Sequence, residues 1–180
     1  CSLNSMPYIL SAIESFKKQT YRNKELIIVN SKSNDSTDEY LKSLKENNIK
    51  VYNFNGNIYA SLNYGTKKAK GKIIGVLHSD DVFFCPRVLF NVISEFKKKN
   101  ADIVYGNILY SKKNNLTIYK RAWTNISLLK KYNLPPHTGS FIKRKILVKN
   151  KYNMNYSISS DTDLLLRLFN KKYRICYLKK

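Results

Sequence analysis

The first hundred residues alternate between two spacings of apolar side chains, one typical of helices and one typical of buried strands. After Pro7, apolar residues return at helical spacing as far as Phe16, which predicts a helix that ends near Gln19. The continuous aliphatic run within Glu25–Asn30 predicts instead a strand that is covered on both faces of a sheet. Helix and strand therefore follow each other directly from the start of the chain.

The same alternation continues, with short connections, to residue 105 and returns near the end of the chain. Further helices are predicted over residues 36–47, 58–70, 86–100 and 160–170, and further strands over residues 49–52, 72–77, 103–105 and 174–178. Ser36 and Glu39 match a capping box at one helix start, and Gly71 fits the left-handed cap position after another helix. This order predicts an α/β fold with a doubly wound, mostly parallel central sheet.

The segment between these two parts has a less regular pattern. It predicts a hairpin across Asn114–Asn115, an amphipathic helix near Ile126–Tyr132 and a break at Pro135–Pro136. Neither an internal repeat nor a linker divides the sequence, so residues 1–180 are expected to form a single domain.

The chain is strongly basic, with 33 Lys and Arg against 12 Asp and Glu and a formal net charge of +21. Such a charge attracts the phosphates of nucleic acids or of anionic lipids. However, only six of the 33 bases are Arg, and the basic runs are as short as Lys97–Lys99, so we interpret most of the Lys as solvated surface. Nucleic acid is therefore not favoured as a partner, and peripheral contact with an anionic membrane is the functional alternative.

The aliphatic runs and the cysteines bear on the location of the chain. Every aliphatic run is far shorter than the about 20 residues needed to cross a bilayer, which predicts a soluble protein. Cys1, Cys85 and Cys176 are odd in number and far apart, which favours neither a disulfide framework nor a clustered zinc site. A reducing, cytoplasmic compartment is expected, with any peripheral binding at the inner face of the membrane.

Two adjacent acids, Asp80 and Asp81, follow the apolar run that ends at Leu77. Asp80 and Asp81 repel each other unless a cation joins them, and Mg²⁺ is commonly held by one or two carboxylates together with substrate phosphates. This pattern favours a metal site for a phosphate ester. The alternative is that the two side chains cap the next turn or helix.

A second pair of acids, Asp161 and Asp163, opens the last predicted helix. Two residues apart on a helix, their side chains diverge by about 200°, so at most one of them faces a cleft. That acid is a candidate general base, which must lie within hydrogen-bond reach of the proton that it takes. The alternative is that it stabilises the positive end of the helix dipole.

Five segments, in this order, resemble the family 2 glycosyltransferases of the GT-A fold over nearly the whole chain. They are YILSAIESFKKQTYRNKELIIVNSKSNDSTDEYL (Tyr8–Leu41), GNIYASLNYGTKKAKGKIIGVLHSDD (Gly56–Asp81), ADIVYGN (Ala101–Asn107), PPHTGSFIKR and SSDTDLLLRL. The second is similar to the pattern GIYDAMNKG…LNSDD of one subgroup. The resemblance implies a single GT-A, Rossmann-like domain that transfers a sugar with inversion from a nucleoside diphosphate, with uracil the expected base.

The resemblance also assigns roles to residues. Asp80 is expected to contact the donor ribose, Asp81 to bind Mg²⁺ or Mn²⁺ at the diphosphate, and Asp161 to act as catalytic base. The remaining donor-binding positions implied by the family are Asn4, Asn30, Asn63 and His137. The expected acceptor is a cell-envelope glycan or a lipid-linked glycan. For His137 the alternative is a purely structural role.

The sequence departs from the family pattern at several points. Asn30 replaces the usual Asp, although its carbonyl can still accept a hydrogen bond from a uracil imide, and Ala60 replaces another Asp. The family's first strand has no counterpart ahead of Cys1, and family members usually continue past the position of Lys180. Two alternatives therefore stand beside the enzyme, namely an inactive GT-A module with a binding or assembly role and a basic nucleic-acid-binding domain.

Overall fold

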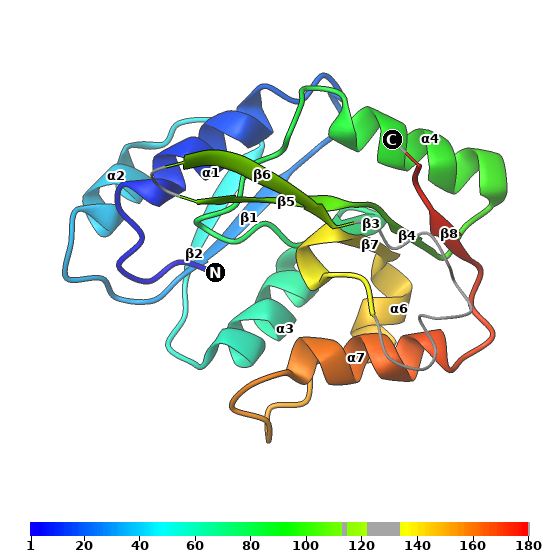
Figure 1. Ribbon diagram of the computed structural model, residues 1–180. Coiled ribbons are helices and arrows are strands. Elements are labelled where there is room, and N and C mark those ends of the chain that lie inside the picture. Colours follow the sequence, from blue (N-terminus) through cyan, green and yellow to red (C-terminus); the bar gives the residue numbers. More distant parts are fainter. Residues whose placement is uncertain (113–114, 122–133, 180) are drawn as a thin grey trace.

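The computed structural model describes residues 1–112, 115–121 and 134–179, and side chains for residues 1–110 and 134–179. Helices and strands alternate through the first 105 residues, as Figure 1 shows. The helices are α1 (Tyr8–Lys17), α2 (Thr37–Ser43), α3 (Ile58–Lys68), α4 (Val88–Lys99), the 3₁₀ turn η1 (His137–Gly139), α6 (Arg144–Lys149) and α7 (Ser160–Phe169). The strands are β1 (Leu26–Asn30), β2 (Ile49–Asn53), β3 (Ile73–Gly75), β4 (Ile103–Tyr105), β5 (Ile108–Lys112), β6 (Asn115–Arg121), β7 (Ser140–Lys143) and β8 (Ile175–Tyr177).

The strands form two sheets in the body of the protein and one hairpin. β1 and β2 are parallel, with Asn30 opposite Asn53. The second sheet has the order β3-β7-β4-β8, in which β7 is antiparallel to both neighbours and β8 is parallel to β4. The predicted α/β class is confirmed, but the second sheet is mixed because β7 runs against β3 and β4.

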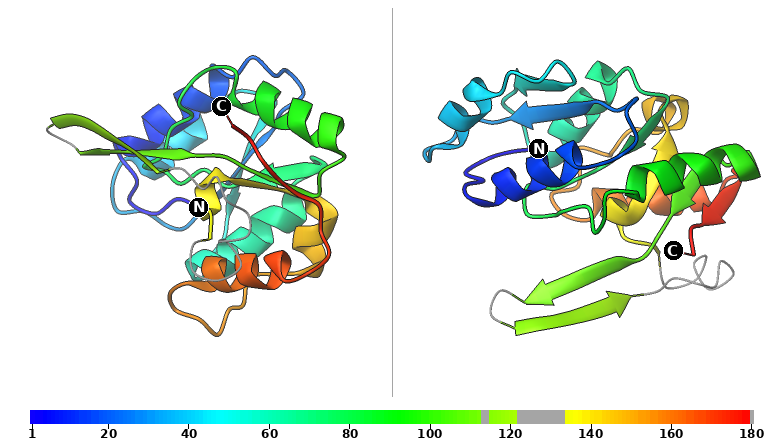
Figure 2. Two further views of the ribbon diagram at one scale, coloured as in Figure 1. Left: turned by 45° about the vertical axis from the view of Figure 1, so that its right-hand side comes forward. Right: turned by 90° about the horizontal axis from the view of Figure 1, so that it is seen from above.

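Helices cover both faces of the strands (Figures 1 and 2). On one side α1 and α4 pack their apolar faces inward, with Ile13 of α1 against Ile28 of β1 and Phe96 of α4 in the cluster around Val104 of β4. On the other side lie α3, α6 and α7, and Leu164 and Leu168 of α7 are completely buried there. The apolar spacing read from the sequence is thus explained by these two layers.

The start of α2 differs from the predicted capping box. Ser36 is the N-cap residue, but its side chain makes no capping hydrogen bond. Asp35 does this instead, because its Oδ1 accepts from the backbone N–H of Thr37 at 3.0 Å and its Oδ2 from that of Met6 at 3.0 Å. The carboxylate one residue earlier reaches both the helix and the loop before α1. The hydroxyl of Thr37, and then these backbone hydrogen bonds, hold the pKa of Asp35 below its usual value.

The prediction for Gly71 is also wrong. All six glycines lie in the part of the chain that the structure describes, and none of them has a positive φ. α3 ends instead at Ala69, whose backbone is extended. The next two N–H groups, of Lys70 and Gly71, both donate to Oε1 of Glu25 at 2.6 Å, so a side chain from the turn before β1 ends this helix.

The first residues of the chain lie beside the carboxyl end of β1. Ser2 forms a parallel bridge with Asn30, its N–H donates to the carbonyl of Val29 at 2.9 Å, and its carbonyl accepts from Ser31 at 2.9 Å. A small slot of about 40 Å³ opens between this contact, α1, β1 and residues 77–79. Within the described residues, the two sheets are not joined by a backbone ladder across this slot.

The second half adds elements that the apolar pattern did not predict. β7 and α6 were not predicted, whereas the hairpin is confirmed by β5 and β6. The helix predicted near Ile126–Tyr132 lies outside the described residues. Among the described residues, we find no helix with the length and apolar character that a membrane span requires.

Candidate functional site

A buried amide at the carboxyl end of β1 is the first element of the site. The side chain of Asn30 is 4% exposed, and its Nδ2 donates to Oδ1 of Asp38 at 2.9 Å. Because a carboxylate can only accept, the amide nitrogen must face Asp38 and the carbonyl must face away from it. That carbonyl oxygen has no hydrogen-bond partner among the described residues, so it presents a buried acceptor without a donor.

The loop after β1 is fastened beside this amide. Asn4 has a φ of 46°, its Oδ1 accepts from the N–H of Asn34 at 2.7 Å, and its own N–H donates to Oγ of Ser33 at 3.0 Å. The N–H of Ser33 in turn approaches Oδ1 of Asp38 at 3.4 Å. The structure therefore brings Asn4 and Asn30 to one hydrogen-bonded loop, in which Asn4 holds the backbone in place.

The carboxylate pair lies in the loop after β3. The N–H of Asp81 donates to the carbonyl of His78 at 3.2 Å, which forms a turn that leaves Asp80 exposed and Asp81 half-buried. Burial raises the pKa of Asp81, the charge of Asp80 adds to that rise, and His78 opposes it. The next helix begins only at Val88 and has no side-chain cap, so the interpretation of the pair as helix caps is wrong.

The donor set of this pair bears on the kind of ion that fits it. Among the described residues, no three His, Cys, Asp or Glu side chains converge tightly enough to hold a metal alone. One half-buried and one exposed carboxylate suit Mg²⁺ or Mn²⁺ when diphosphate oxygens and water complete the coordination. The residues present therefore fit a metal that arrives with a phosphate ester.

A buried His–Tyr pair lies next to the second carboxylate group. Nε2 of His137 lies 2.5 Å from the hydroxyl of Tyr152, and the two side chains meet edge to face. Burial lowers the pKa of His137 to about 4, although the nearby charge of Asp161 acts in the opposite direction. Burial, with a contribution from Asp161, also raises the pKa of Tyr152. Both rings are therefore neutral at pH 7, beside an acid.

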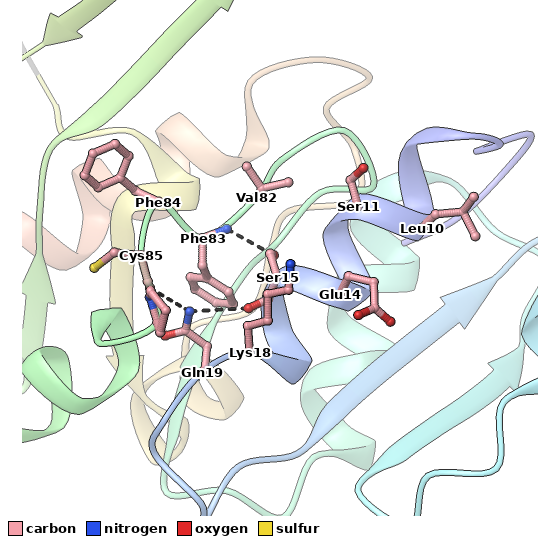
Figure 3. Close-up of a pocket in the computed structure, with 11 residues that line it drawn as sticks. Leu10, Ser11, Glu14, Ser15, Lys18, Gln19, Val82, Phe83, Phe84 and Cys85 are labelled. Carbon is pink, nitrogen blue, oxygen red and sulfur yellow. Dashed lines mark hydrogen bonds between the residues drawn. The ribbon is translucent and has the colours of Figure 1, made fainter.

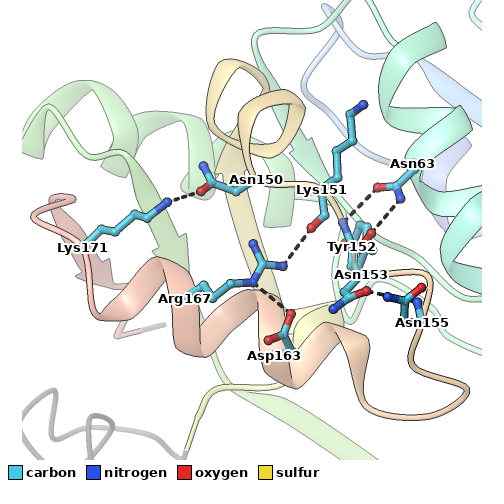
Figure 4. A network of polar contacts seen from close by, with 9 residues as sticks. All are labelled: Asn63, Asn150, Lys151, Tyr152, Asn153, Asn155, Asp163, Arg167 and Lys171. Atoms are coloured by element: carbon cyan, nitrogen blue, oxygen red, sulfur yellow. Dashed lines mark hydrogen bonds and ion pairs between the residues drawn. The ribbon is translucent and has the colours of Figure 1, made fainter.

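The two acids of α7 point to different partners, as their spacing predicts. Oδ2 of Asp163 accepts from Nε of Arg167 at 2.9 Å, and the same guanidinium donates to the carbonyl of Lys151 at 2.8 Å (Figure 4). The charge of Asp161 lies close enough to the buried pair of His137 and Tyr152 to contribute an increase to the pKa of both side chains. Of the two acids, Asp161 is thus the one that borders the candidate site.

The side chain of Asn63, a predicted donor-binding residue, is bonded to the backbone of Tyr152. Its Nδ2 donates to the carbonyl of Tyr152 at 2.9 Å, and its Oδ1 accepts from the N–H of the same residue at 3.0 Å (Figure 4). These two bonds join α3 to the segment before α7. Asn63 thereby positions Tyr152, whose hydroxyl contacts His137, and its contact with the donor stays a prediction.

His78 links the two carboxylate groups, since its ring lies 6.0 Å from that of His137, centroid to centroid.

The sequence model of the family described as "Glycosyl transferase family 2" matches residues 1–159. The chain belongs to glycosyltransferase family 2. The predicted family and the predicted GT-A fold are thereby confirmed.

Three comparisons place this family 2 chain among known proteins. It is 31% identical to an uncharacterized glycosyltransferase of Rickettsia bellii over 156 residues, which are 83% of this chain and 22% of that protein. It is 27% identical over 190 residues to the minor teichoic acid biosynthesis protein GgaB of Bacillus subtilis, covering 96% of this chain and 21% of GgaB. The chain thus spans about a fifth of the length of these relatives.

The third comparison is structural. S. aureus TarS (residues 1–349), solved in complex with UDP-GlcNAc, superposes with a TM-score of 0.78 at 16% identity. The superposition covers 99% of this chain and 57% of the TarS chain. At this identity the likeness shows a shared fold.

Three residues of the site were not predicted for this family 2 glycosyltransferase. Asp38 orients Asn30, His78 lies between the carboxylate groups, and Tyr152 contacts His137. Asp38 lies within the STDE stretch and His78 directly precedes Ser79-Asp80, so family motifs could have indicated both. Tyr152 has no local signal, because its role depends on contacts with residues far away in the sequence.

A larger pocket begins at Val82, directly after Asp81. It has a volume of about 440 Å³ and lies between α1 and residues 82–86, as Figure 3 shows. Its walls are joined by hydrogen bonds from the N–H of Phe83 to Oγ of Ser15 at 3.1 Å and from Nε2 of Gln19 to the carbonyl of Cys85 at 2.8 Å. No predicted site residue lines it, so Asn30, Asp81 and Asp161 stay the candidate functional site.

Proposed function

We propose that this chain forms the donor-binding part of an inverting glycosyltransferase that uses a UDP-sugar and a cell-envelope or lipid-linked glycan acceptor. The observation that carries the proposal is the buried, unpaired carbonyl of Asn30, fixed in direction by Asp38. The imide N–H of uracil is a donor that satisfies such an acceptor. The complex of TarS with UDP-GlcNAc and the teichoic acid role of GgaB support this choice of donor and acceptor.

The direction of the Asn30 amide leads to a prediction about base selection. Cytosine presents a bare ring nitrogen where uracil presents an N–H, so the chain is expected to bind UDP about tenfold more tightly than CDP. In Asp38→Asn, the Asn30 side-chain amide can rotate by 180°, because an amide at position 38 can both donate and accept. The ratio of UDP affinity to CDP affinity should therefore become smaller. Calorimetric titration of both nucleotides measures it, with Glu39→Gln on the same helix as the control of equal charge change. Equal affinity of the original chain for UDP and CDP contradicts the assignment.

The remaining residues suggest a sequence of chemical steps. Asp81 would hold a divalent cation against the diphosphate, where the ion would supply positive charge to the leaving group, and Asp80 would contact the ribose. Asp161 takes the proton of the acceptor hydroxyl as that oxygen attacks the anomeric carbon from the opposite face. Because His137 is neutral, it does not pair as a cation with the Asp161 carboxylate.

The metal assignment predicts a change in the dependence of UDP binding on Mn²⁺. Asp81→Asn is expected to remove the about tenfold or larger gain in UDP affinity that Mn²⁺ gives the original chain, since one charged ligand is lost. Asp80→Asn is the matched control, because it weakens the ribose contact and leaves the Mn²⁺ gain in place. Absence of UDP binding in every condition would overturn the donor site, and an unchanged Mn²⁺ gain in Asp81→Asn would overturn the metal ligand.

We place the reaction in the cytoplasm. The three cysteines of the chain are all unpaired in the structure, which supports a reducing compartment. The nucleotide-linked donor and the envelope acceptor would then meet at the inner face of a membrane.

A further inference from the structure

The segment that leads into α7 has a composition unlike the rest of the chain. Charged residues make up 25% of the sequence, yet residues 152–160 contain none. Every second side chain here is large, apolar and exposed, with exposed fractions of 59% for Met154, 46% for Tyr156 and 77% for Ile158. Figure 1 shows this loop extending below α7, away from the strands. We call residues 153–159 the apolar loop.

The base of the apolar loop is held on both sides. Before it, Tyr152 is 4% exposed and is joined to Asn63 by two hydrogen bonds (Figure 4). After it, Ser160 is completely buried at the start of α7. Inside it, Oδ1 of Asn153 accepts from the N–H of Asn155 at 3.0 Å. The three apolar side chains are therefore held toward solvent by a fixed backbone, and their exposure costs free energy until something covers them.

Two exposed cations, Lys149 and Lys151, directly precede the apolar loop. Residues 144–173 contain seven Lys and Arg and two acids, Asp161 and Asp163. Asp163 is paired with Arg167, and Asp161 lies beside the buried His–Tyr pair, so neither neutralises the exposed Lys149 and Lys151. The guanidinium of Arg167 donates to the carbonyl of Lys151, which places α7 directly beside the entrance of the loop.

The apolar loop carries no charge, and positively charged Lys side chains lie next to it. This combination is complementary to the surface of an anionic bilayer. Apolar side chains enter the boundary between headgroups and acyl chains, and each Lys near the surface adds about a fivefold gain in attraction to anionic lipid. A protein partner would also cover apolar side chains, but the surrounding positive charge favours a surface of anionic headgroups.

We propose that the apolar loop docks the protein on an anionic membrane, with Met154, Tyr156 and Ile158 inserted and Lys149 and Lys151 against the headgroups. Docking in this way brings the start of α7 to the lipid surface. The delivery of a lipid-linked acceptor to Asp161 rests on the proposed function, whereas the docking itself does not depend on donor binding.

Sedimentation with vesicles tests the docking. The protein is expected to bind vesicles of phosphatidylcholine with phosphatidylglycerol and to bind phosphatidylcholine alone at least about tenfold less. Met154→Ser with Ile158→Ser should lower binding to the anionic vesicles about tenfold, because the inserted apolar area is lost. Phe84→Ser is the matched control, since Phe84 is 76% exposed and lies at the separate pocket beside α1.

A second pair of variants tests the charge. Lys149→Glu with Lys151→Glu should lower binding about tenfold or more, whereas Lys98→Glu with Lys99→Glu at the end of α4 changes the net charge equally and should have a smaller effect. Equal losses in the two charge variants, or full binding by the Ser variants, would overturn the proposal. So would loop-dependent self-association of the protein without vesicles.

UDP titration of the same variants separates the two proposals. Unchanged UDP affinity is expected in the loop variants and shows that they are folded. Vesicle binding without any UDP binding would leave the docking supported and the donor site overturned.

Discussion

Asp161→Asn is expected to slow the release of UDP from the proposed UDP-sugar donor, with UDP-GlcNAc as the test donor, by about 10²- to 10⁴-fold, the usual contribution of a general base. Asn keeps the size and polarity of the side chain but cannot take a proton, so UDP affinity should stay within about twofold. A coupled assay of UDP release, in the presence of Mn²⁺, measures the rate, and calorimetry measures the affinity.

The control for this variant lies two residues later on the same helix. Asp163→Asn removes the same charge and breaks the contact with Arg167, which costs about 0.5 kcal/mol of stability. Its rate should stay within a few-fold of the original. If Asp161→Asn retains the full rate, or if both variants lose it equally, the assignment of Asp161 as base is wrong.

The free energy of unfolding is expected to fall by about 3 kcal/mol as the pH is lowered from 7 to 4, through His137 alone. Burial lowers the pKa of His137 to about 4 in the folded protein, against 6.5 for the exposed side chain. Between these values the unfolded chain binds a proton that the folded protein does not, so stability is lost as the pH falls. Urea unfolding at a series of pH values measures this slope.

A variant separates this contribution from the carboxylates that titrate in the same range. His137→Gln has no titrating group and can still hydrogen-bond to the hydroxyl of Tyr152. The fall in its free energy of unfolding between pH 7 and pH 4 should therefore be smaller by about 3 kcal/mol. His78→Gln is the control, because it removes a histidine at the edge of the site. Parallel curves for the original protein and His137→Gln would show that His137 titrates normally.

The elements that could be predicted from the sequence are those in which apolar residues follow a regular spacing over the whole element. The strands around Ile28 and Val104 were predicted because continuous aliphatic residues face two covering layers. β7 was not predicted, because it is short and pairs through Ile142 with strands that lie far earlier in the chain. α6 has only six residues, so its apolar spacing covers too few turns to be read as a helix.

Local patterns failed where a side chain from elsewhere took the same hydrogen bonds. The capping box at Ser36 and the cap at Gly71 both describe plausible local geometry. In each case a neighbouring carboxylate, Asp35 or Glu25, accepts the N–H groups instead and also ties the helix end to another part of the fold. Sequence alone gives no measure of such competition.

The same distinction applies to the site. The divergence of Asp161 and Asp163 follows from helical geometry and was predicted correctly. The buried amide of Asn30 lies at the strand end that the apolar run indicates. The bonds of Asn63 to Tyr152 could not be predicted because the two residues lie 89 positions apart in the sequence. The neutral state of His137 could not be predicted either, because it depends on burial in the folded protein.

The slot between β1 and the second sheet has a consequence for cooperativity. Asn30 belongs to the unit of β1 and β2, whereas Asp161 belongs to the layer packed on the four-stranded sheet, and no backbone ladder among the described residues joins the two. Local opening of the first unit can therefore occur without breaking the strand pairing of the second. A nucleotide that contacts both units would couple their opening, so part of its binding free energy would add to the packing of α3, which already joins β1 to α6.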